Sequence, residues 1–420
     1  MAITGLGVLA PNAHGLEAYE AALRGGVSGI RFHEPLAQLG FGCQVGGIPQ
    51  GVEELQRRYF TDEELFAMNA NMIYAAIAAI DAWTDAGFTV PPPDSAEPDW
   101  ETGAIIGTGI GGIDTIAETL APRTQAGRVK RLGSTMVEQI MSSGNSARVA
   151  GKLGLGNQVS TNSSACNTGT EAVVQAFHRI QNGLAKRMLA GGSEGHSHYI
   201  WAGFDAMKVL NRTRNDDPAA ASRPMSASAA GFIPGSGAGV LMLEELETAR
   251  ARGARVYAEV MGVALNCGGH RQGGSMTAPN PTSVQRCLRA ALGMAGIDGR
   301  DVGAINGHLT ATFADPYEVG NWSQALGLAP ARMPLIHSTK SLIGHALGAA
   351  GGLECVASVL ELHHGFVHGS VNCDDLHPAL AAYAGCIPHE TVDVPGLAIV
   401  AKASFGFGDV NGCVIFRRAE

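Results

Sequence analysis

Short apolar runs that open into glycine-rich turns constrain the fold of this chain more than any other feature. Three of them are AIIGTGIGG at 104–112, MLAGGSEG at 188–195 and ASFGFGDVNG at 403–412. Strands that are covered on both faces have this composition, because the chain is apolar along the strand and turns where the strand ends. Between the runs, apolar residues recur at helical spacing, so the sequence predicts alternating strands and helices of an α/β protein. The clearest helical stripes are Ile73/Ile77/Ile80/Trp83, Val173/Ala176/Phe177/Ile180, Val284/Leu288/Ala291/Leu292 and Leu353/Val356/Ala357/Leu360.

The chain is long enough for two packed units. Its 420 residues exceed the ~250–300 that one hydrophobic core supports, so we predict two halves, 1–250 and 251–420, with the boundary near 245–255. No repeat is visible in the sequence itself. Strands are predicted near 188–192, 238–243, 255–265, 302–306, 334–337, 397–403 and 412–416, and surface loops at 90–98 and 213–224.

Composition excludes several classes of protein. With 45% hydrophobic and 16% charged residues, the chain can bury a large interior, which argues against disorder. A formal net charge of −9 argues against nucleic-acid binding. The eight cysteines contain no CxxC pair, which favours a reducing compartment. Because no apolar run approaches the ~20 residues needed to cross a bilayer, we predict a cytoplasmic protein without a membrane span.

The segment SSACNTG at 163–169 carries the first candidate for chemistry. Its small residues permit a tight turn, and a helix is predicted to begin near Asn167. A cysteine at a helix N-terminus faces unpaired N–H groups, which favour the thiolate and lower the thiol pKa. Cys166 is therefore a candidate nucleophile. The alternative, a small buried apolar residue, remains open from this segment alone.

Two further segments place histidines where strands end. His308 follows the apolar run VGAI within NGHLTAT, and His345 closes HSTKSLIGH ahead of a glycine-rich helix that carries Glu354. Catalytic residues of α/β proteins commonly lie at strand ends, although a lone histidine there is more often structural. Lys340, His345 and Glu354 together indicate a functional cluster.

In these segments the chain resembles β-ketoacyl-carrier-protein synthases of the elongating type. SSACNTG, NGHLTAT, STKSLIGHALGAAG and ASFGFGDVN are similar to the four ordered signatures of that family, and further similar segments run from ITGLGVLAPN to NGCVIF. The resemblance implies a thiolase-like α/β fold, in which two similar halves with mixed central sheets pack in five layers (α-β-α-β-α). It also implies decarboxylative condensation of a cysteine-bound acyl chain with malonyl-carrier protein.

The resemblance also implies residue roles. Cys166 would be the acyl nucleophile, and His308 and His345 would stabilise the enolate formed when the malonyl unit loses carbon dioxide. Lys340 and Glu354 would form a supporting charged pair. Phe405 would be the gate and, together with the Cys166 N–H, would donate to the oxyanion. Thr277, Thr310 and Thr312 would bind the pantetheine, and Ile110 would form part of the acyl pocket. Neither a metal nor a cofactor is implied, because the substrates arrive on the phosphopantetheine of the carrier.

The implied partners are an acyl carrier protein and a second subunit, which is either an identical chain or a chain-length-factor-like homologue. Carrier proteins are acidic and this chain is acidic too, so docking must use a confined basic surface. The candidates are Arg57, Arg58, Lys130, Arg131, Arg212 and Arg214.

Several positions depart from the family pattern. Leu309 stands where a glycine is usual, Asp409 and Val410 replace a glycine–threonine pair, Ser275 replaces a common histidine, and SASAAG at 226–231 replaces a charged segment. We expect these positions to cluster near the entrance or gate of the site. They favour a specialised polyketide or polyene synthase over housekeeping fatty-acid synthesis.

Three rival interpretations are weaker. GTGIGG at 107–112 satisfies GxGxxG, but the basic GRVKRLGS follows where a nicotinamide-binding fold needs an acidic residue. A catalytically silent chain-length factor would lack the cysteine. The cluster His363, His364 and His368 is predicted to be a solvated helix end rather than a metal site, and His196 and His198 are interpreted in the same way.

Overall fold

The structure is a computed structural model that describes residues 1–94 and 97–419. Within these residues, eleven strands form one mixed sheet. From one edge to the other it runs β11 (Leu335–His337), β10 (Ala304–Asn306), β14 (Ile399–Gly406), β15 (Val410–Arg418), β9 (Ala258–Cys267), β1 (Ala2–Ala10), β8 (Gly237–Glu244), β7 (Arg187–Glu194), β5 (Thr102–Gly107) and β6 (Val159–Ser160), with β2 (Ala13–His14) paired to β1.

The sheet is built from the same arrangement twice. In the first half, β8 pairs antiparallel with both β1 and β7, and β5 lies parallel between β7 and β6. In the second half, β15 pairs antiparallel with both β9 and β14, and β10 lies parallel between β14 and β11. The halves join where β1 meets β9, and the chain passes from β8 to β9 through α12 (Leu246–Ala251). Two similar halves are therefore present although no sequence repeat is visible.

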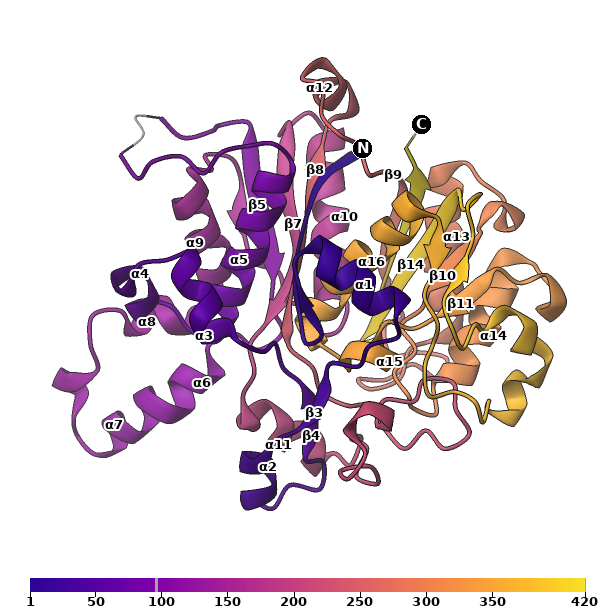
Figure 1. Ribbon diagram of the computed structural model, residues 1–420, viewed down its shortest axis with the longest axis horizontal. Coiled ribbons are helices and arrows are strands. Elements are labelled where there is room, and N and C mark those ends of the chain that lie inside the picture. Colours follow the sequence, from indigo (N-terminus) through magenta and orange to yellow (C-terminus); the bar gives the residue numbers. More distant parts are fainter. Residues whose placement is uncertain (95–96, 420) are drawn as a thin grey trace.

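Helices separate and cover the two half-sheets. α5 (Ala70–Asp85) and α9 (Gly144–Leu153) cover the outer face of the first half, and α13 (Pro281–Ala295) and α14 (Asp315–Leu326) cover that of the second. α10 (Thr168–Gln181) and α16 (Ala350–His364) lie between the half-sheets (Figure 1). The predicted five-layer order is confirmed.

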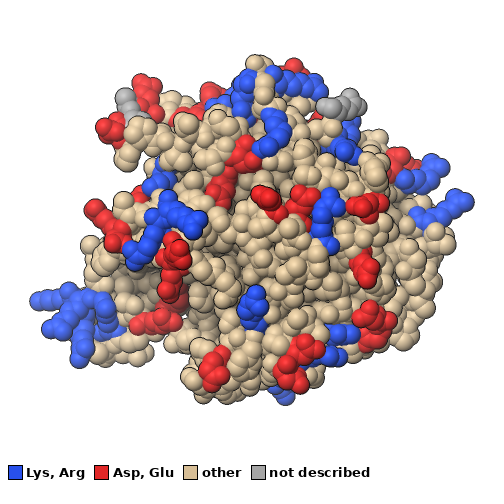
Figure 2. Space-filling view, viewed as in Figure 1, with Lys and Arg blue, Asp and Glu red and all other residues tan. Residues whose placement is uncertain are grey.

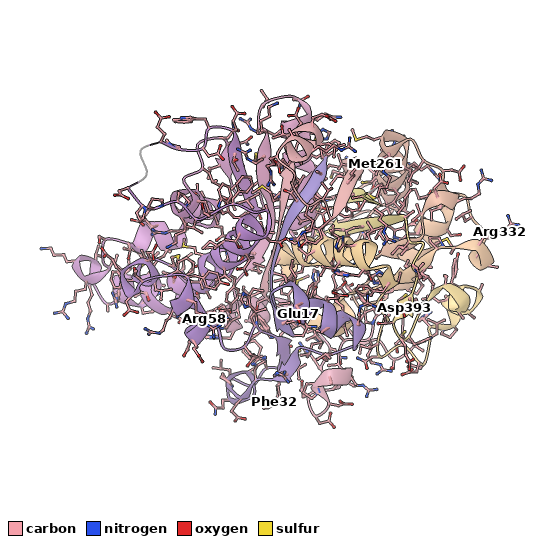
Figure 3. All side chains as sticks on the ribbon, turned by 45° about the horizontal axis from the view of Figure 1, so that its top comes forward. Glu17, Phe32, Arg58, Met261, Arg332 and Asp393 are labelled. Atoms are coloured by element: carbon pink, nitrogen blue, oxygen red, sulfur yellow. The ribbon has the colours of Figure 1, made fainter. Side chains whose placement is uncertain are left out.

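Shorter elements complete the chain. They are α1 (Leu16–Arg24), β3 (Ile30–Phe32), α2 (Glu34–Gln38), β4 (Val45–Gly47), α3 (Val52–Leu55), α4 (Asp62–Phe66), α6 (Ile113–Thr115), α7 (Ala121–Gln125), α8 (Met136–Ile140), α11 (His198–Ala206), α15 (Lys340–Ile343), β12 (Phe366–Val367) and β13 (Val392–Asp393). In Figure 3, Glu17 on α1 lies over the middle of the molecule, whereas Arg332 projects from the outer edge of the second half. Among the described residues, no helix has the length and apolar character that crossing a membrane requires.

The predicted elements match the structure closely. Each of the seven predicted strands is found, and each of the four apolar stripes lies on a helix: α5, α10, α13 and α16. The predicted loop at 213–224 contains a single 3₁₀ turn, Pro218–Ala220. The predicted loop at 90–98 includes residues 95–96, which lie outside the described residues.

Glycines allow the two central helices to meet at their N-terminal ends. A Cβ on Gly169 of α10 would lie 2.4 Å from the backbone nitrogen of Gly352 in α16. A Cβ on Gly352 would lie 2.2 Å from the carbonyl oxygen of Gly239 in β8. Backbone cannot yield to such an overlap as a flexible side chain can, so both positions need glycine. This close approach brings the residues just before α10 together with those just before α16.

Candidate active site

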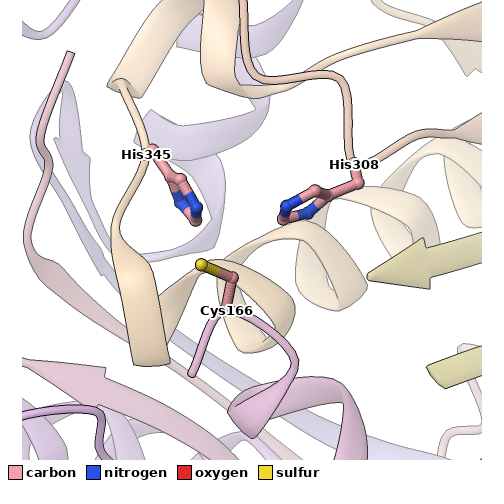
Figure 4. Close-up of side chains that lie close together, drawn as sticks. All are labelled: Cys166, His308 and His345. Carbon is pink, nitrogen blue, oxygen red and sulfur yellow. The ribbon is translucent and has the colours of Figure 1, made fainter. Parts of the chain in front are cut away.

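Cys166, His308 and His345 meet in the interior between the two halves, as Figure 4 shows. Their Sγ and ring nitrogen atoms lie within 4.8 Å of one another, and the two imidazole rings are 5.3 Å apart and nearly perpendicular. Cys166 immediately precedes the N-cap of α10, His308 follows β10, and His345 lies between α15 and α16. Three segments that are distant in sequence thus form one site, as the strand-end argument predicts.

The turn that carries Cys166 is held by its neighbours. Ala165 has a φ of 50°, and the Thr168 hydroxyl accepts the Ser164 N–H (2.8 Å) while donating to the Ala165 carbonyl (2.6 Å). Burial raises the pKa of the Cys166 thiol to about 11, with Lys340 and the Phe407 N–H opposing that rise. The predicted lowering of this pKa is therefore wrong for the resting site, because loss of water around the sulfur outweighs its position at a helix start. The residue rests as a thiol.

Both histidines are neutral. Burial lowers their pKa values well below 6.5, and Lys340 adds to the effect at each ring. The Leu347 N–H donates to His345 Nδ1 (3.2 Å), so the His345 proton sits on Nε2. His308 Nδ1 has no partner among the described residues, but its backbone is fixed because Glu318 accepts the N–H groups of His308 and Leu309 (2.6 and 2.8 Å). Burial raises the pKa of Glu318 to about 7.

A buried charge cluster lies beside the histidines. The Lys340 ammonium contacts one oxygen of Glu354, and the Lys402 ammonium lies 2.9 Å from the other. All three side chains are at most 1% exposed. The predicted Lys340–Glu354 pair is thus present, whereas sequence reasoning missed Lys402. A lysine inside the apolar run IVAKASFG is the signal that identifies it, because a fully buried lysine needs a partner.

A cavity of about 490 Å³ opens onto this cluster. Cys166 and the two histidines lie at its wall together with the three predicted pantetheine ligands, Thr277, Thr310 and Thr312. The Thr310 and Thr312 hydroxyls are 3.1 Å apart. Two strongly exposed aromatic residues, Phe313 and Tyr317, also line the cavity. The cavity therefore presents apolar side chains and threonine hydroxyl groups beside the thiol.

Phe405 lines the cavity together with Cys166, but its neighbour Phe407 supplies the N–H that is predicted for it. The backbone N–H that reaches the Cys166 sulfur belongs to Phe407, whereas Phe405 lies two residues earlier in β14 with its ring 6.1 Å from that of His308. Ile110 is 41% exposed and is not part of the cavity wall that holds Cys166. Its N–H donates to the buried carboxylate of Glu194. The repeated FGFG gives no sequence signal that distinguishes Phe405 from Phe407.

The positions that depart from the family pattern do not all lie at the entrance. Leu309 is fully buried and has a φ of 22°, a backbone conformation that glycine adopts more easily, which accounts for the usual glycine. Asp409 is also buried, and it accepts the N–H groups of His270 (3.1 Å) and Asn280 (2.7 Å). The expected cluster at the entrance is therefore wrong for these two residues. Asp409 instead fixes the ends of the loop that contributes Thr277 to the cavity.

Segment 226–231 is anchored at its first residue by a carboxylate and at its last by the Ala311 carbonyl, which lies between the two cavity threonines Thr310 and Thr312. Ser226 is buried, and its hydroxyl donates to Asp375, which also pairs with Arg223 (3.0 Å). Ser275 is exposed in the loop near the cavity. Val410 begins β15 and is partly buried.

A second buried cluster corrects the expectation for the C-terminal histidines. His363 and His364 end α16, as predicted, but His368 is fully buried beside His337 and Glu361. His368 Nδ1 donates to the Gly369 carbonyl (2.9 Å), so its Nε2 accepts from His337 Nδ1 (3.1 Å). His337 Nε2 then faces Glu361 Oε2 at 3.3 Å with a lone pair. Burial raises the pKa of Glu361 to about 7 and lowers that of His337 to about 3, so below about pH 7 Glu361 is protonated and His337 is neutral.

This arrangement predicts a pH-dependent contribution to stability. Because the folded chain holds the Glu361 proton up to about pH 7 and an unfolded glutamate releases it near 4.5, stability falls as pH rises through that window, on the order of 3 kcal/mol. Glu361→Gln keeps the acceptor for the His368 N–H (3.0 Å) and supplies a donor to His337, but it does not titrate. Denaturant unfolding between pH 5 and pH 8 should show a shallower loss of stability in this variant than in the wild type. Equal slopes would contradict the protonated state.

Two groups in the described part of the chain are close enough to hold a metal ion. They are Cys166/His308/His345 and His337/Glu361/His368. In the second group, His337 Nδ1, both nitrogens of His368 and Glu361 Oε1 have hydrogen-bond partners, whereas His337 Nε2 and Glu361 Oε2 have none among the described residues. Metal-free chemistry at the first group stays a prediction.

Comparison with known proteins extends over the whole chain. Residues 1–249 match the profile described as "Beta-ketoacyl synthase, N-terminal domain", and residues 257–374 match "Beta-ketoacyl synthase, C-terminal domain". The 3-oxoacyl-[acyl-carrier-protein] synthase 2 of Vibrio cholerae is 35% identical over 99% of this chain and 98% of its own length. The 3-oxoacyl-[acyl-carrier-protein] synthase 1 of Escherichia coli K12 is 33% identical over 100% of this chain and 98% of its own length.

Solved structures of ketosynthases superpose on the whole of this chain. A β-ketoacyl synthase from Burkholderia phymatum superposes with a TM-score of 0.91 at 29% identity, covering 100% of this chain and 99% of that one. The ishigamide ketosynthase/chain length factor superposes with a TM-score of 0.89, at the same identity and coverage. A type II polyketide ketosynthase bound to its acyl-carrier protein and the hexaketide gives 0.87 at 28% identity, again with 100% and 99% coverage. The five-layer fold and both matched domains show that this chain is an enzyme of the β-ketoacyl synthase family, with the thiolase-like fold.

Proposed function

We propose that Cys166 carries the growing acyl chain and condenses it with malonyl-carrier protein in a type II polyketide or polyene pathway. The observation that carries the catalytic part is the convergence of one thiol and two neutral imidazoles on the wall of a cavity of about 490 Å³. A cysteine-free chain-length factor would lack this nucleophile.

The first step transfers the acyl group. The Cys166 sulfur attacks the thioester carbonyl, a carbon–sulfur bond forms, and the carrier thiol leaves with the proton that the cysteine gives up. The N–H groups of Cys166 and Phe407 stabilise the transient oxyanion, since the Phe407 N–H already points at the sulfur. We assign this donor, and the gate position, to Phe407 in place of Phe405.

The second step makes the carbon–carbon bond. The malonyl carboxylate leaves as carbon dioxide, and its electron pair becomes an enolate whose oxygen carries negative charge. His345 donates to that oxygen from Nε2–H, the tautomer that the Leu347 N–H imposes, and His308 donates from the facing ring. The enolate carbon attacks the acyl thioester, and the carbon–sulfur bond breaks so that Cys166 leaves as a thiolate, which takes a proton from water to restore the resting thiol. Thr277, Thr310 and Thr312 hydrogen-bond the amides of the arm.

The partners are proposed from surface charge and from the open sheet edge. Among the predicted docking residues, Arg57, Arg58, Arg212 and Arg214 already pair with nearby carboxylates. Lys130 and Arg131 are exposed in the basic cluster beyond α7, which projects at the lower left of Figure 2. An acidic carrier can bind there. β6 pairs only with β5 in the described sheet, and Val159 on β6 is exposed, so a second subunit can extend the sheet.

The more specific part of the proposal is the biosynthetic pathway, polyketide or polyene synthesis. The ishigamide ketosynthase/chain length factor and the polyketide ketosynthase are among the similar structures, and Leu309, Asp409 and Ser275 depart from the fatty-acid pattern. We expect the chain to form a heterodimer with a chain-length-factor-like protein encoded beside it.

Co-purification with the neighbouring gene products, mass determination and product analysis test this expectation. The heterodimer should make polyketide or polyene chains on a dedicated carrier. A stable homodimer that makes saturated fatty-acid precursors on the housekeeping carrier would overturn the pathway assignment and leave the condensation chemistry intact.

A further inference from the structure

Lys402 is a fully buried cation that neither the family resemblance nor the proposed mechanism uses. It lies in β14, three residues before Phe405, and is 0% exposed. Its ammonium lies 2.9 Å from Glu354 Oε2 and 3.0 Å from Ser404 Oγ, and it also donates to the Ala403 carbonyl. The ammonium therefore donates two hydrogen bonds, to Ser404 and Ala403, and forms an ion pair with Glu354. A buried ammonium with this complete a set of partners is a built feature of the interior.

Glu354 serves two lysines at once. Lys340 contacts Oε1 and Lys402 contacts Oε2, so the carboxylate is held from both sides. Two cations share one anion, which leaves a net positive charge in a dry region next to His308 and His345. The ionisable groups near the two histidines also include Cys166, whose sulfur lies within 4.8 Å of a nitrogen of each ring, and Glu318, which accepts the His308 N–H. Asp315 lies beside Glu318, and Glu194 faces Cys166 from β7.

We propose that Lys402 is a positioning residue for the condensation step: it fixes Glu354, and through it Lys340, and leaves a net positive charge beside the two catalytic histidines. The proposal rests on the roles proposed above for those histidines. That charge favours neutral imidazoles, and Lys402 is among the causes that lower the pKa of each ring. It also favours the negative enolate, because electrostatic effects are strong where water is excluded.

Lys402→Met tests this inference, with Lys186→Met as the matched control, since Lys186 is an exposed lysine paired with Glu245. Loss of the charge raises the pKa of both imidazoles, so they become protonated at higher pH. The acid limb of the kcat/KM profile for condensation should therefore move to higher pH, by about one unit. We expect kcat to fall about 10- to 100-fold, with a smaller change in KM and little change in the rate of Cys166 acylation. The control should match the wild type.

Chemical rescue separates charge from packing. Lys402→Ala leaves the oxygens of Glu354, Ser404 and Ala403 around a space that a small cation can occupy. Ammonium chloride should restore part of kcat and return the acid limb towards its wild-type position, whereas tetramethylammonium chloride at equal ionic strength should not. This variant, purified in ammonium chloride and then dialysed, is also the second test should Lys402→Met fail to fold.

The outcomes separate this inference from the proposed function. If His308→Ala is inactive but Lys402→Met keeps the wild-type kcat and the wild-type acid limb of the kcat/KM profile, the proposed role of Lys402 is overturned. If His308→Ala and His345→Ala both decarboxylate normally, the proposed histidine roles themselves fail. A folded Lys402→Ala that is inactive but unresponsive to ammonium, with an unshifted acid limb, would also overturn the inference, since it shows loss of packing alone.

Discussion

Replacing Cys166 by serine is expected to abolish condensation, with a loss of about 10³-fold or more. A serine hydroxyl needs a general base before it can attack a thioester, and the site is not arranged to provide one at His345, whose Nδ1 is occupied by the Leu347 N–H and whose Nε2 carries the proton. A thiol needs less assistance from a general base, because it is a softer nucleophile and a stronger acid than a hydroxyl group. Intact-mass measurement after incubation with acyl-carrier protein should show one acyl adduct on the wild type and none on the variant.

Cys267→Ser is the matched control, because Cys267 is an exposed thiol to which the proposed mechanism assigns no role. This control should acylate and condense at the wild-type rate. An adduct that persists on Cys166→Ser at full rate would place the nucleophile elsewhere and overturn the assignment. The experiment also excludes the silent-subunit interpretation, because a chain-length factor would acquire no adduct in either protein.

The sequence predicts the position of the catalytic groups better than their electrostatics. Small residues before a helix indicate where Cys166 lies, and apolar runs ending in histidines indicate that His308 and His345 meet it. The thiol pKa depends on how completely three distant segments enclose the sulfur, and no local pattern records that. The helix-start argument alone therefore gave the wrong direction for the resting enzyme.

Buried polar residues are the second kind of feature that local patterns describe poorly. His368 follows a helix end, where solvent exposure is the usual expectation, yet the chain folds it against His337 and Glu361. Lys402 is visible as a charge in an apolar strand, but only the fold shows that it shares Glu354 with Lys340. In both cases one partner comes from a distant segment: His337 lies 31 residues before His368, and Glu354 lies 48 residues before Lys402.

The duplicated topology shows why fold class was nevertheless predictable. Strand positions follow from apolar runs and glycine turns, and these signals survive when the residues themselves have diverged. β8 and β15 occupy equivalent places in the two half-sheets, and both are predicted as strands, although their sequences GAGVLMLE and VNGCVIFRR share no repeat. The strand pattern of the two half-sheets is therefore retained although their amino-acid sequences differ.

Alanine at either catalytic histidine should block decarboxylation more than acylation. His308→Ala and His345→Ala each remove a donor to the enolate oxygen, and loss of one such donor costs about 10²–10³-fold in kcat. Acylation of Cys166 should continue, because its oxyanion is held by backbone N–H groups. Release of labelled carbon dioxide from malonyl-carrier protein measures the first effect and intact mass the second. His364→Ala is the matched control, since His364 lies at the exposed end of α16 beside Glu20.

The double variant decides whether the two imidazoles serve one oxygen. If both donate to the same enolate, each needs the other to hold the charge, so the double variant should lose far less than the product of the single losses. Independent roles would instead give additive losses in free energy. One ring nitrogen of each histidine and the Cys166 sulfur lie within 4.8 Å of one another, so both nitrogens can reach one oxygen beside the sulfur, and we expect the non-additive result. Normal carbon dioxide release from both single variants would exclude the enolate role altogether.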